Sequence, residues 1–209
     1  MPLDLSKIKT IYFIGIKGVA MTGLAVICKR LGLKVSGSDV PEKFITDKIL
    51  DREKIEVFEN FSADNLKSKP DLVVIGASWD EKNIEVAEAA RIKIPSISDS
   101  KFRGILSKMK RTIAVTGVHG KTTTTALLSF VFSRAGLEPS FLIGTGTVPD
   151  LKGNADWSGG KHFIVEGDEY IGDQKNRQPK FLDLDPAVSL ITSLEWEHVD
   201  VFPDLESLE

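Results

Sequence analysis

The residues best suited to chemistry form one short loop, Thr116–Thr125, which reads Thr-Gly-Val-His-Gly-Lys-Thr-Thr-Thr-Thr. The loop follows an apolar, β-prone run, Thr112–Val115, and opens a helical pattern over Ala126–Ala135. Glycines in such a turn let backbone N–H groups close around phosphates, and the helix N-terminus adds positive potential. The order strand, glycine turn, helix therefore predicts that this loop binds ATP.

Two side chains of this loop have roles that follow from their chemistry. Lys121 would reach the β- and γ-phosphates, and the Thr122 hydroxyl would ligate Mg²⁺. Val115 stands where the full phosphate-loop pattern has its first glycine, so the alternative is a simple helix cap. His119 would orient the substrate or merely pack in the loop. The predicted ATP-binding residues are Gly117, Val118, His119, Gly120, Lys121, Thr122 and Thr123.

A carboxylate is placed to share the metal ion with Thr122. Glu166 ends the apolar run Phe163–Glu166, which is typical of a strand. At a strand end its side chain could reach the same Mg²⁺, although a solvated acid is the alternative. We predict Glu166 as a metal ligand.

A second glycine loop, Gly15–Gly23, follows the strand-like run Ile11–Ile14. A dinucleotide fingerprint would need glycine at positions 15, 17 and 20, but Lys17 and Ala20 occupy two of them. The middle glycine lets the backbone approach a pyrophosphate, so the pattern disfavours NAD.

A diphosphate could still bind at the start of the following helix, near Gly15, Gly18 and Met21. Asp39 lies about twenty residues further on, where an acid can accept hydrogen bonds from a ribose or a base. The alternative is a structural turn with a capping acid.

Short apolar runs alternate with helical patterns along the whole chain, which predicts an α/β architecture with mainly parallel sheets. We expect two such units with a seam near Lys108–Arg111: a Rossmann-like domain over 1–109 and the first part of a P-loop ATPase-like α/β domain over 110–209. The polar, turn-rich segment Val148–Gly160 is expected to be exposed and mobile. The expected strands are Ile11–Ile14, Lys34–Gly37, Leu72–Ile75, Ile94–Ile97, Thr112–Val115, Phe141–Ile143, Phe163–Glu166 and Val188–Thr192, and the expected helices include Asn83–Arg91 and Lys101–Met109.

Composition indicates an ordinary globular protein of 209 residues, with 42% hydrophobic residues, 27% charged residues and a net charge of −3. This balance gives no sign of a nucleic-acid partner. No apolar run is long enough to span a membrane, and the N-terminus does not resemble a signal peptide. We expect a cytoplasmic protein without membrane association. The single cysteine, Cys28, is expected to be a core residue.

Taken together, these motifs resemble the Mur ligases, which build the peptide of the bacterial cell-wall precursor. The resemblance extends over nearly the whole chain and in the family's order. Val118 replaces a threonine of the family's loop, Ser193 an asparagine and Glu197 an aspartate. The matching segments are Gly15–Ala25, Ser36–Asp39, Gly76–Ser78, Thr116–Thr123, Glu166–Tyr170 and Leu194–Asp200.

The resemblance implies an ATP- and Mg²⁺-dependent amide ligase of peptidoglycan precursor synthesis or recycling. The muramyl carboxylate of UDP-N-acetylmuramate would be activated as an acyl phosphate, which an incoming amine attacks. His198 matches the family's ligand for a second Mg²⁺, so Lys121, His119 and His198 are the expected catalytic residues. The implied UDP-binding residues are Gly15, Ile16, Gly18, Met21, Asp39 and Ser78.

The amine substrate is either L-alanine or the tripeptide L-Ala-γ-D-Glu-meso-diaminopimelate. Asp168–Tyr170, Lys180-Phe181 and the Phe202–Leu205 stretch favour the tripeptide, whereas Ile171–Pro179 departs from both patterns. A folylpolyglutamate- or cyanophycin-type ligase is an alternative, disfavoured by the first glycine loop. A non-catalytic module that binds UDP-sugars or NAD is another. Because the family normally continues well past this point, the chain is expected to be truncated and weakly competent on its own.

Overall fold

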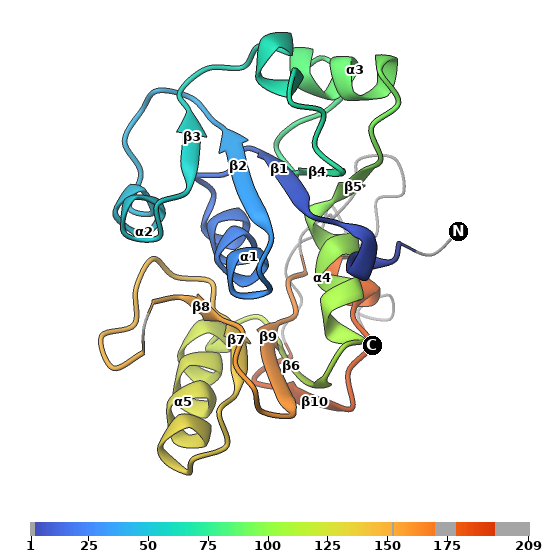
Figure 1. The fold of residues 1–209 in the computed structure, drawn as a ribbon. Helices are drawn as coiled ribbons and strands as arrows, with labels where there is room; N and C mark the ends of the chain where they lie inside the picture. Colours follow the sequence, from blue (N-terminus) through green and yellow to red (C-terminus); the bar gives the residue numbers. More distant parts are fainter. Residues whose placement is uncertain (1–2, 152, 170–178, 195–209) are drawn as a thin grey trace. The chain divides into compact units, whose positions relative to one another are not determined.

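The computed structural model describes residues 3–151, 153–169 and 179–194. The chain divides into two compact units, Met1–Asp99 and Ser100–Glu209, each built on its own five-stranded sheet (Figure 1). The division falls at the start of helix α4 (Asp99–Ser107), whereas the sequence places the seam at 108–111. None of the described helices is long and apolar enough to cross a membrane.

The first unit is a parallel sheet in the order β3-β2-β1-β4-β5, the arrangement expected of a Rossmann-like domain. Its strands are β1 (Thr10–Ile14), β2 (Lys34–Ser38), β3 (Glu56–Phe58), β4 (Leu72–Ile75) and β5 (Ser96–Ser98). Its helices are α1 (Val19–Arg30), α2 (Asp47–Arg52) and α3 (Ile84–Arg91), with 3₁₀ turns at Leu5–Lys7 and Ala63–Leu66.

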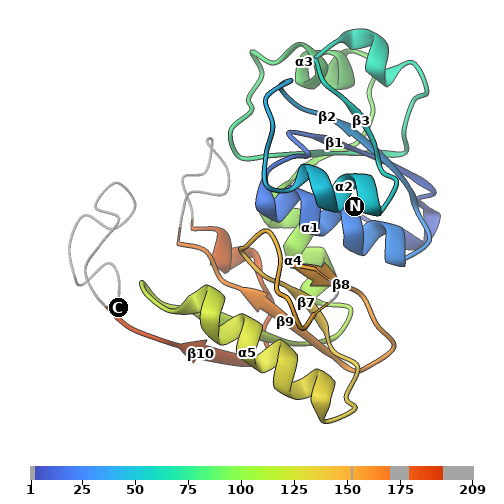
Figure 2. The ribbon, with the colours of Figure 1, turned by 90° about the vertical axis from the view of Figure 1, so that its left-hand side faces the viewer.

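The sheet of the first unit is buried on both faces, as apolar parallel strands require. Tyr12 and Ile14 of β1 pack with Leu66 and Ala89, on the side of α3. The residues of β1 that alternate with Tyr12 and Ile14 are equally buried. They face the other side of the sheet, along which α1 runs (Figure 2). Cys28 of α1 is fully buried, as expected.

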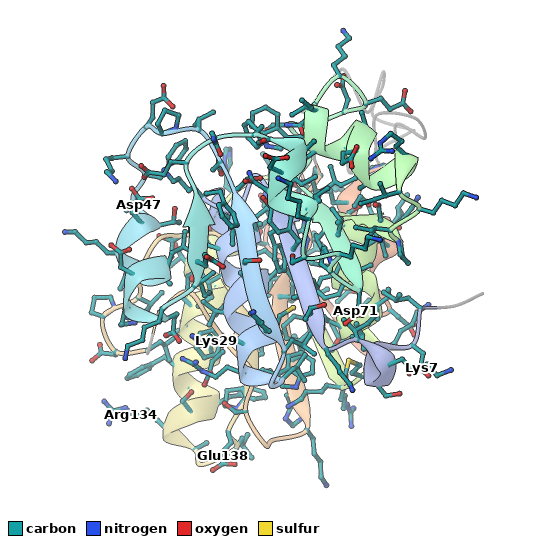
Figure 3. All side chains as sticks on the ribbon, turned by 45° about the horizontal axis from the view of Figure 1, so that its top comes forward. Lys7, Lys29, Asp47, Asp71, Arg134 and Glu138 are labelled. Atoms are coloured by element: carbon teal, nitrogen blue, oxygen red, sulfur yellow. The ribbon has the colours of Figure 1, made fainter. Side chains whose placement is uncertain are left out.

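Asp71 ties the starts of β1 and β4 together (Figure 3). Its Oδ2 atom accepts hydrogen bonds from the backbone N–H groups of Lys9, at 2.9 Å, and Thr10, at 2.8 Å. The Thr10 hydroxyl donates to the same atom at 2.9 Å. Because these bonds fix the register of the two strands, their carboxyl ends also meet at one level.

The second unit is a sheet in the order β10-β6-β9-β7-β8, parallel except for the β7–β8 pair. Helix α5 (Lys121–Arg134) packs on β6, β7 and β9. A 3₁₀ turn covers Lys180–Asp183. The strands are β6 (Arg111–Thr116), β7 (Ser140–Leu142), β8 (Ala155–Asp156), β9 (His162–Glu166) and β10 (Val188–Ile191).

The prediction that the whole segment Val148–Gly160 is exposed is wrong. Gly153, Asn154 and Ala155 are buried, and Ala155 lies in β8, which pairs with β7. Val148 and Leu151 pack against the cluster of Phe141, Ile143 and Ile164. The few apolar residues of this polar segment cover an otherwise open edge of the sheet, which local composition does not reveal.

Candidate functional site

The loop between β6 and α5 has the backbone of a phosphate-binding turn. Gly117 and Gly120 have φ values of +110° and +83°, a region that residues with a side chain rarely adopt. Val115, at the position of the missing glycine, is a fully buried residue of β6 paired with Glu166 of β9. The turn therefore starts after the strand, and the valine does not obstruct it.

The end of β10 holds this loop in place. The Thr192 hydroxyl lies within hydrogen-bond distance of two carbonyl oxygens, those of Thr116, at 2.9 Å, and His119, at 2.5 Å, and its single proton can be donated to either. The Ser193 carbonyl accepts from the Val118 N–H at 3.3 Å, and the Ser193 hydroxyl accepts from the His119 N–H at 2.9 Å. Ser193, at the family's asparagine position, thus fixes the loop by hydrogen bonding.

Lys121 is folded back onto its own loop and onto an acid. Its Nζ atom donates to Glu169 Oε2 at 2.8 Å and to the carbonyls of Gly117 and Val118 at 2.7 and 3.3 Å. Glu169 Oε1 accepts from the Gly117 N–H at 3.1 Å, and the residue is 5% exposed.

Thr122 and Glu166 meet directly. The Thr122 hydroxyl donates to Glu166 Oε2 at 3.0 Å, and Glu166 Oε1 accepts from the Gly144 N–H at 2.6 Å. Burial raises the pKa of Glu166, and the hydrogen bonds from Gly144 and Thr122 act in the opposite direction. A hydroxyl and a carboxylate in contact at a helix start are the hard oxygen donors that Mg²⁺ prefers, so the residues fit this ion.

The remaining predicted residues of the second unit lie at different depths. His119, Gly120 and Thr123 are exposed, whereas Val118 is half-buried. His198 lies outside the described residues. Among the residues that the structure describes, no cluster of three or more His, Cys, Asp or Glu side chains could hold a metal ion.

The predicted UDP loop lies at the carboxyl ends of β1 and β4, where the strand order of the first sheet reverses. The N–H groups of Gly15 and Ile16 both donate to the Ser38 carbonyl, at 2.9 and 3.0 Å. Gly18 is the N-cap residue of α1, and Met21 is buried in the first turn of that helix. In open α/β sheets such a switch point is where ligands bind.

Asp39 is used by the protein itself. Its Oδ2 atom accepts from the Lys17 N–H at 2.7 Å and its Oδ1 atom from the Val40 N–H at 2.9 Å, and the residue is 5% exposed. The buried Lys17 ammonium donates to the carbonyls of Val40 and Glu42. These contacts favour the structural alternative for Asp39.

Ser78 is exposed just after β4, and its neighbour Trp79 covers the glycine loop. A Cβ atom on Gly15 would lie 2.3 Å from the indole nitrogen of Trp79, so the ring packs directly on this glycine. The structure therefore brings Gly15 and the β4 loop together.

Sequence reasoning assigned no role to three residues that shape the second site: Glu169, Thr192 and Ser193. Glu169 appeared in the sequence only as part of the family-like segment Glu166–Tyr170, with no contact or role of its own. Thr192 appeared only as the end of an apolar run, and Ser193 only as a replacement of the family's asparagine. No local signal linked either residue to a loop more than seventy residues away.

Comparison with known proteins identifies the family of both units. Residues 10–111 match the model of the Mur ligase family catalytic domain, and residues 115–209 match that of the Mur ligase middle domain. The chain is 41% identical over 199 residues to the UDP-N-acetylmuramate–L-alanine ligase of Desulfitobacterium hafniense, covering 95% of this chain and 42% of that protein. The corresponding ligase of Borrelia garinii is 37% identical over 214 residues, covering all of this chain and 44% of that protein.

Two solved structures of named ligases resemble it as well. The UDP-N-acetylmuramate:L-alanyl-γ-D-glutamyl-meso-diaminopimelate ligase of Neisseria meningitidis superposes with a TM-score of 0.86 at 32% identity, covering 96% of this chain and 65% of that one. The UDP-N-acetylmuramate–alanine ligase of Thermotoga maritima superposes with a TM-score of 0.80 at 28% identity, covering 96% of this chain and 45% of that one. The chain thus spans less than half the length of the curated relatives it matches. With both of its units matched in order, the chain belongs to the Mur ligase family.

Proposed function

We propose that the second unit binds ATP through the loop Gly117–Thr123. The observation that carries this proposal is the loop itself, with glycines at positive φ before a helix whose first residues are Lys121 and Thr122. The first N–H groups of a helix have no intrahelical partner and are available to phosphate oxygens. Lys121 would add a point charge to the same phosphates.

Thr122 and Glu166 would hold the Mg²⁺ that accompanies the nucleotide. When bound, the ion would neutralise negative charge on the phosphates during phosphoryl transfer. The resemblance adds His198 as a ligand of a second ion and His119 as an orienting residue, and both roles are predictions.

We propose that the first unit binds the uridine diphosphate of UDP-N-acetylmuramate. Gly15, Ile16, Gly18 and Met21 form the turn and helix start at the switch point, and Ser78 lies on the neighbouring loop. A diphosphate at the start of α1 would meet the positive end of the helix dipole, as in other glycine loops. Asp39 would act mainly by holding this turn through Lys17.

The chain would accordingly supply the nucleotide-sugar and ATP sites of a cytoplasmic ATP-dependent amide ligase. The reaction would form an acyl phosphate on UDP-N-acetylmuramate, which an amine attacks. The curated relatives are named for L-alanine and the Neisseria structure for the tripeptide, so both amines remain candidates.

Calorimetric titration of the chain with ATP–Mg²⁺, UDP-N-acetylmuramate, UMP and NAD⁺ tests this function. We expect saturable binding of ATP–Mg²⁺ and of UDP-N-acetylmuramate, and none of NAD⁺. Binding of NAD⁺ alone would contradict the ligase assignment. ADP release that requires UDP-N-acetylmuramate and either amine would identify a ligase rather than a module that only binds nucleotides.

A further inference from the structure

Glu169 occupies part of the proposed phosphate site. Its two oxygens span the Gly117 N–H, at 3.1 Å, and the Lys121 ammonium, at 2.8 Å. These are a backbone N–H of the glycine turn and the lysine that an ATP phosphate would use. The carboxylate therefore sits on these two donors as a phosphate oxygen pair would.

Two further N–H donors of the turn also have partners within the protein. The Val118 and His119 N–H groups donate to the carbonyl and hydroxyl of Ser193. The Lys121 ammonium additionally donates to two carbonyls of its own loop. The Lys121 ammonium and three N–H groups of the loop therefore have partners without a ligand, and Glu169 supplies the charge that balances Lys121.

We propose that Glu169 is an internal anion that must leave Lys121 and Gly117 when a nucleotide binds, and that it thereby sets the nucleotide affinity of this chain. The proposal rests on the proposed ATP function of the loop. Glu169 acts as a positioning residue: it keeps Lys121 ordered, and its release is the step that frees the phosphate donors.

The ion pair between Lys121 and Glu169 is largely buried, which strengthens it. The side chains of Lys121 and Glu169 are 16% and 6% exposed, so water screens the pair little. A protein whose binding-competent form is only a fraction of the whole shows an affinity reduced by that fraction. Removing the competing carboxylate should therefore tighten binding, whereas loss of a merely structural contact would weaken it.

The test is the ADP affinity of Glu169→Gln and Glu169→Ala in Mg²⁺-free buffer, by calorimetry. We expect both variants to bind ADP roughly threefold to tenfold more tightly than the wild type. The matched control is Asp168→Asn, which removes the neighbouring negative charge, from a residue that forms an ion pair with Lys180. We expect its ADP affinity to stay within about twofold of the wild type, since it does not touch the loop donors.

Thermal unfolding provides a second measurement that a structural role would not reproduce. Without nucleotide, Glu169→Ala should melt below the wild type, because Lys121 has lost its anionic partner. At saturating ADP the difference should disappear, since the nucleotide replaces that partner.

Several results of these measurements would overturn the proposal. Unchanged or weaker ADP binding in both Glu169 variants overturns the proposal, as does an equal gain in Asp168→Asn or a melting difference that persists with ADP. If neither the wild type nor any variant binds nucleotide, the ATP function fails and this inference falls with it.

Discussion

Lys121 carries the only positive side-chain charge within the Gly117–Thr123 loop. We expect Lys121→Ala to weaken ATP binding by about tenfold to a hundredfold, because a charge-assisted hydrogen bond contributes about 1.5–3 kcal/mol. Calorimetric titration with ATP–Mg²⁺ measures this loss. ATP affinity equal to that of the wild type would mean that the loop is only a helix cap.

The same substitution has a structural consequence that the sequence did not suggest. Lys121→Ala leaves the buried Glu169 carboxylate without its cation, which should destabilise the second unit. The double variant Lys121→Ala/Glu169→Gln removes that unpaired charge and is the proper control for the binding experiment. It should recover most of the lost stability without recovering ATP affinity.

Glu166 should make the effect of Mg²⁺ on ATP binding depend on pH. Burial raises the pKa of Glu166 in the folded state, so its proton competes with Mg²⁺ as pH falls. The raised pKa also means that its contribution to folding stability is full at low pH and is lost as pH rises through that pKa. Isothermal titrations from pH 8 to pH 5 should show the Mg²⁺ enhancement of ATP affinity shrinking toward acid.

The control for this pH dependence is Glu166→Gln. The variant cannot ionise at this position, so its Mg²⁺ enhancement should be small and should fall toward acid less steeply than that of the wild type, since only the ATP phosphates still take up protons. Its Mg²⁺-free ADP affinity should stay within about twofold of the wild type. An enhancement as large as that of the wild type would remove Glu166 from the metal site.

The start of α1 offers a test at the scale of an element. A Cβ atom on Gly18 would meet nothing closer than 3.6 Å, so the apo fold should accept a side chain there. We expect Gly18→Val to weaken binding of UDP ligands by about tenfold or more, because the side chain would block a diphosphate from the helix N-terminus. Titration with UDP-N-acetylmuramate measures the change, and circular dichroism verifies the fold.

Gly37 provides the contrasting glycine for that experiment. A Cβ atom there would lie 2.4 Å from the Phe13 carbonyl oxygen, so Gly37→Val should disrupt the pairing of β1 and β2. Loss of UDP binding with an altered fold is expected for Gly37→Val only. Undiminished UDP binding in a folded Gly18→Val variant would exclude the first loop from the site.

At the scale of the whole molecule, the single cysteine reports on one unit. Cys28 is fully buried in α1, and burial raises the pKa of its thiol well above the ordinary value. The native protein should therefore resist an aromatic disulfide reagent at pH 8, since the thiolate is the reactive form. Labelling should follow unfolding of the first unit.

Core variants can show whether the two units unfold separately. Leu24→Ala removes a fully buried side chain of the first unit and should cost about 2–5 kcal/mol, which accelerates Cys28 labelling. Phe163→Ala makes a comparable cavity in the second unit and should leave labelling nearly unchanged. Equal acceleration by both variants would show that the chain unfolds as one cooperative body.

The longer secondary-structure elements and the two glycine loops of this protein could be predicted from its sequence alone. Apolar runs bounded by turn residues predicted the longer strands and helices, because the apolar faces of those elements repeat at short, regular intervals. The two glycine loops stood out because each follows a strand and opens a helix. The short elements α2 and β3 were not predicted, because six and three residues are too few to show a periodic pattern.

Only the tertiary structure decided how the loops are completed. Lys121 and Glu169 are 48 positions apart, and Ser193 lies 74 positions from His119, so no local pattern could pair them. Asp39 had the spacing of a ribose ligand, but its burial against Lys17 favours a structural role. The sequence pattern shows which residues stand at the end of each strand. Which of them then touch depends on the parallel sheet, whose neighbouring strands bring distant parts of the chain to one edge.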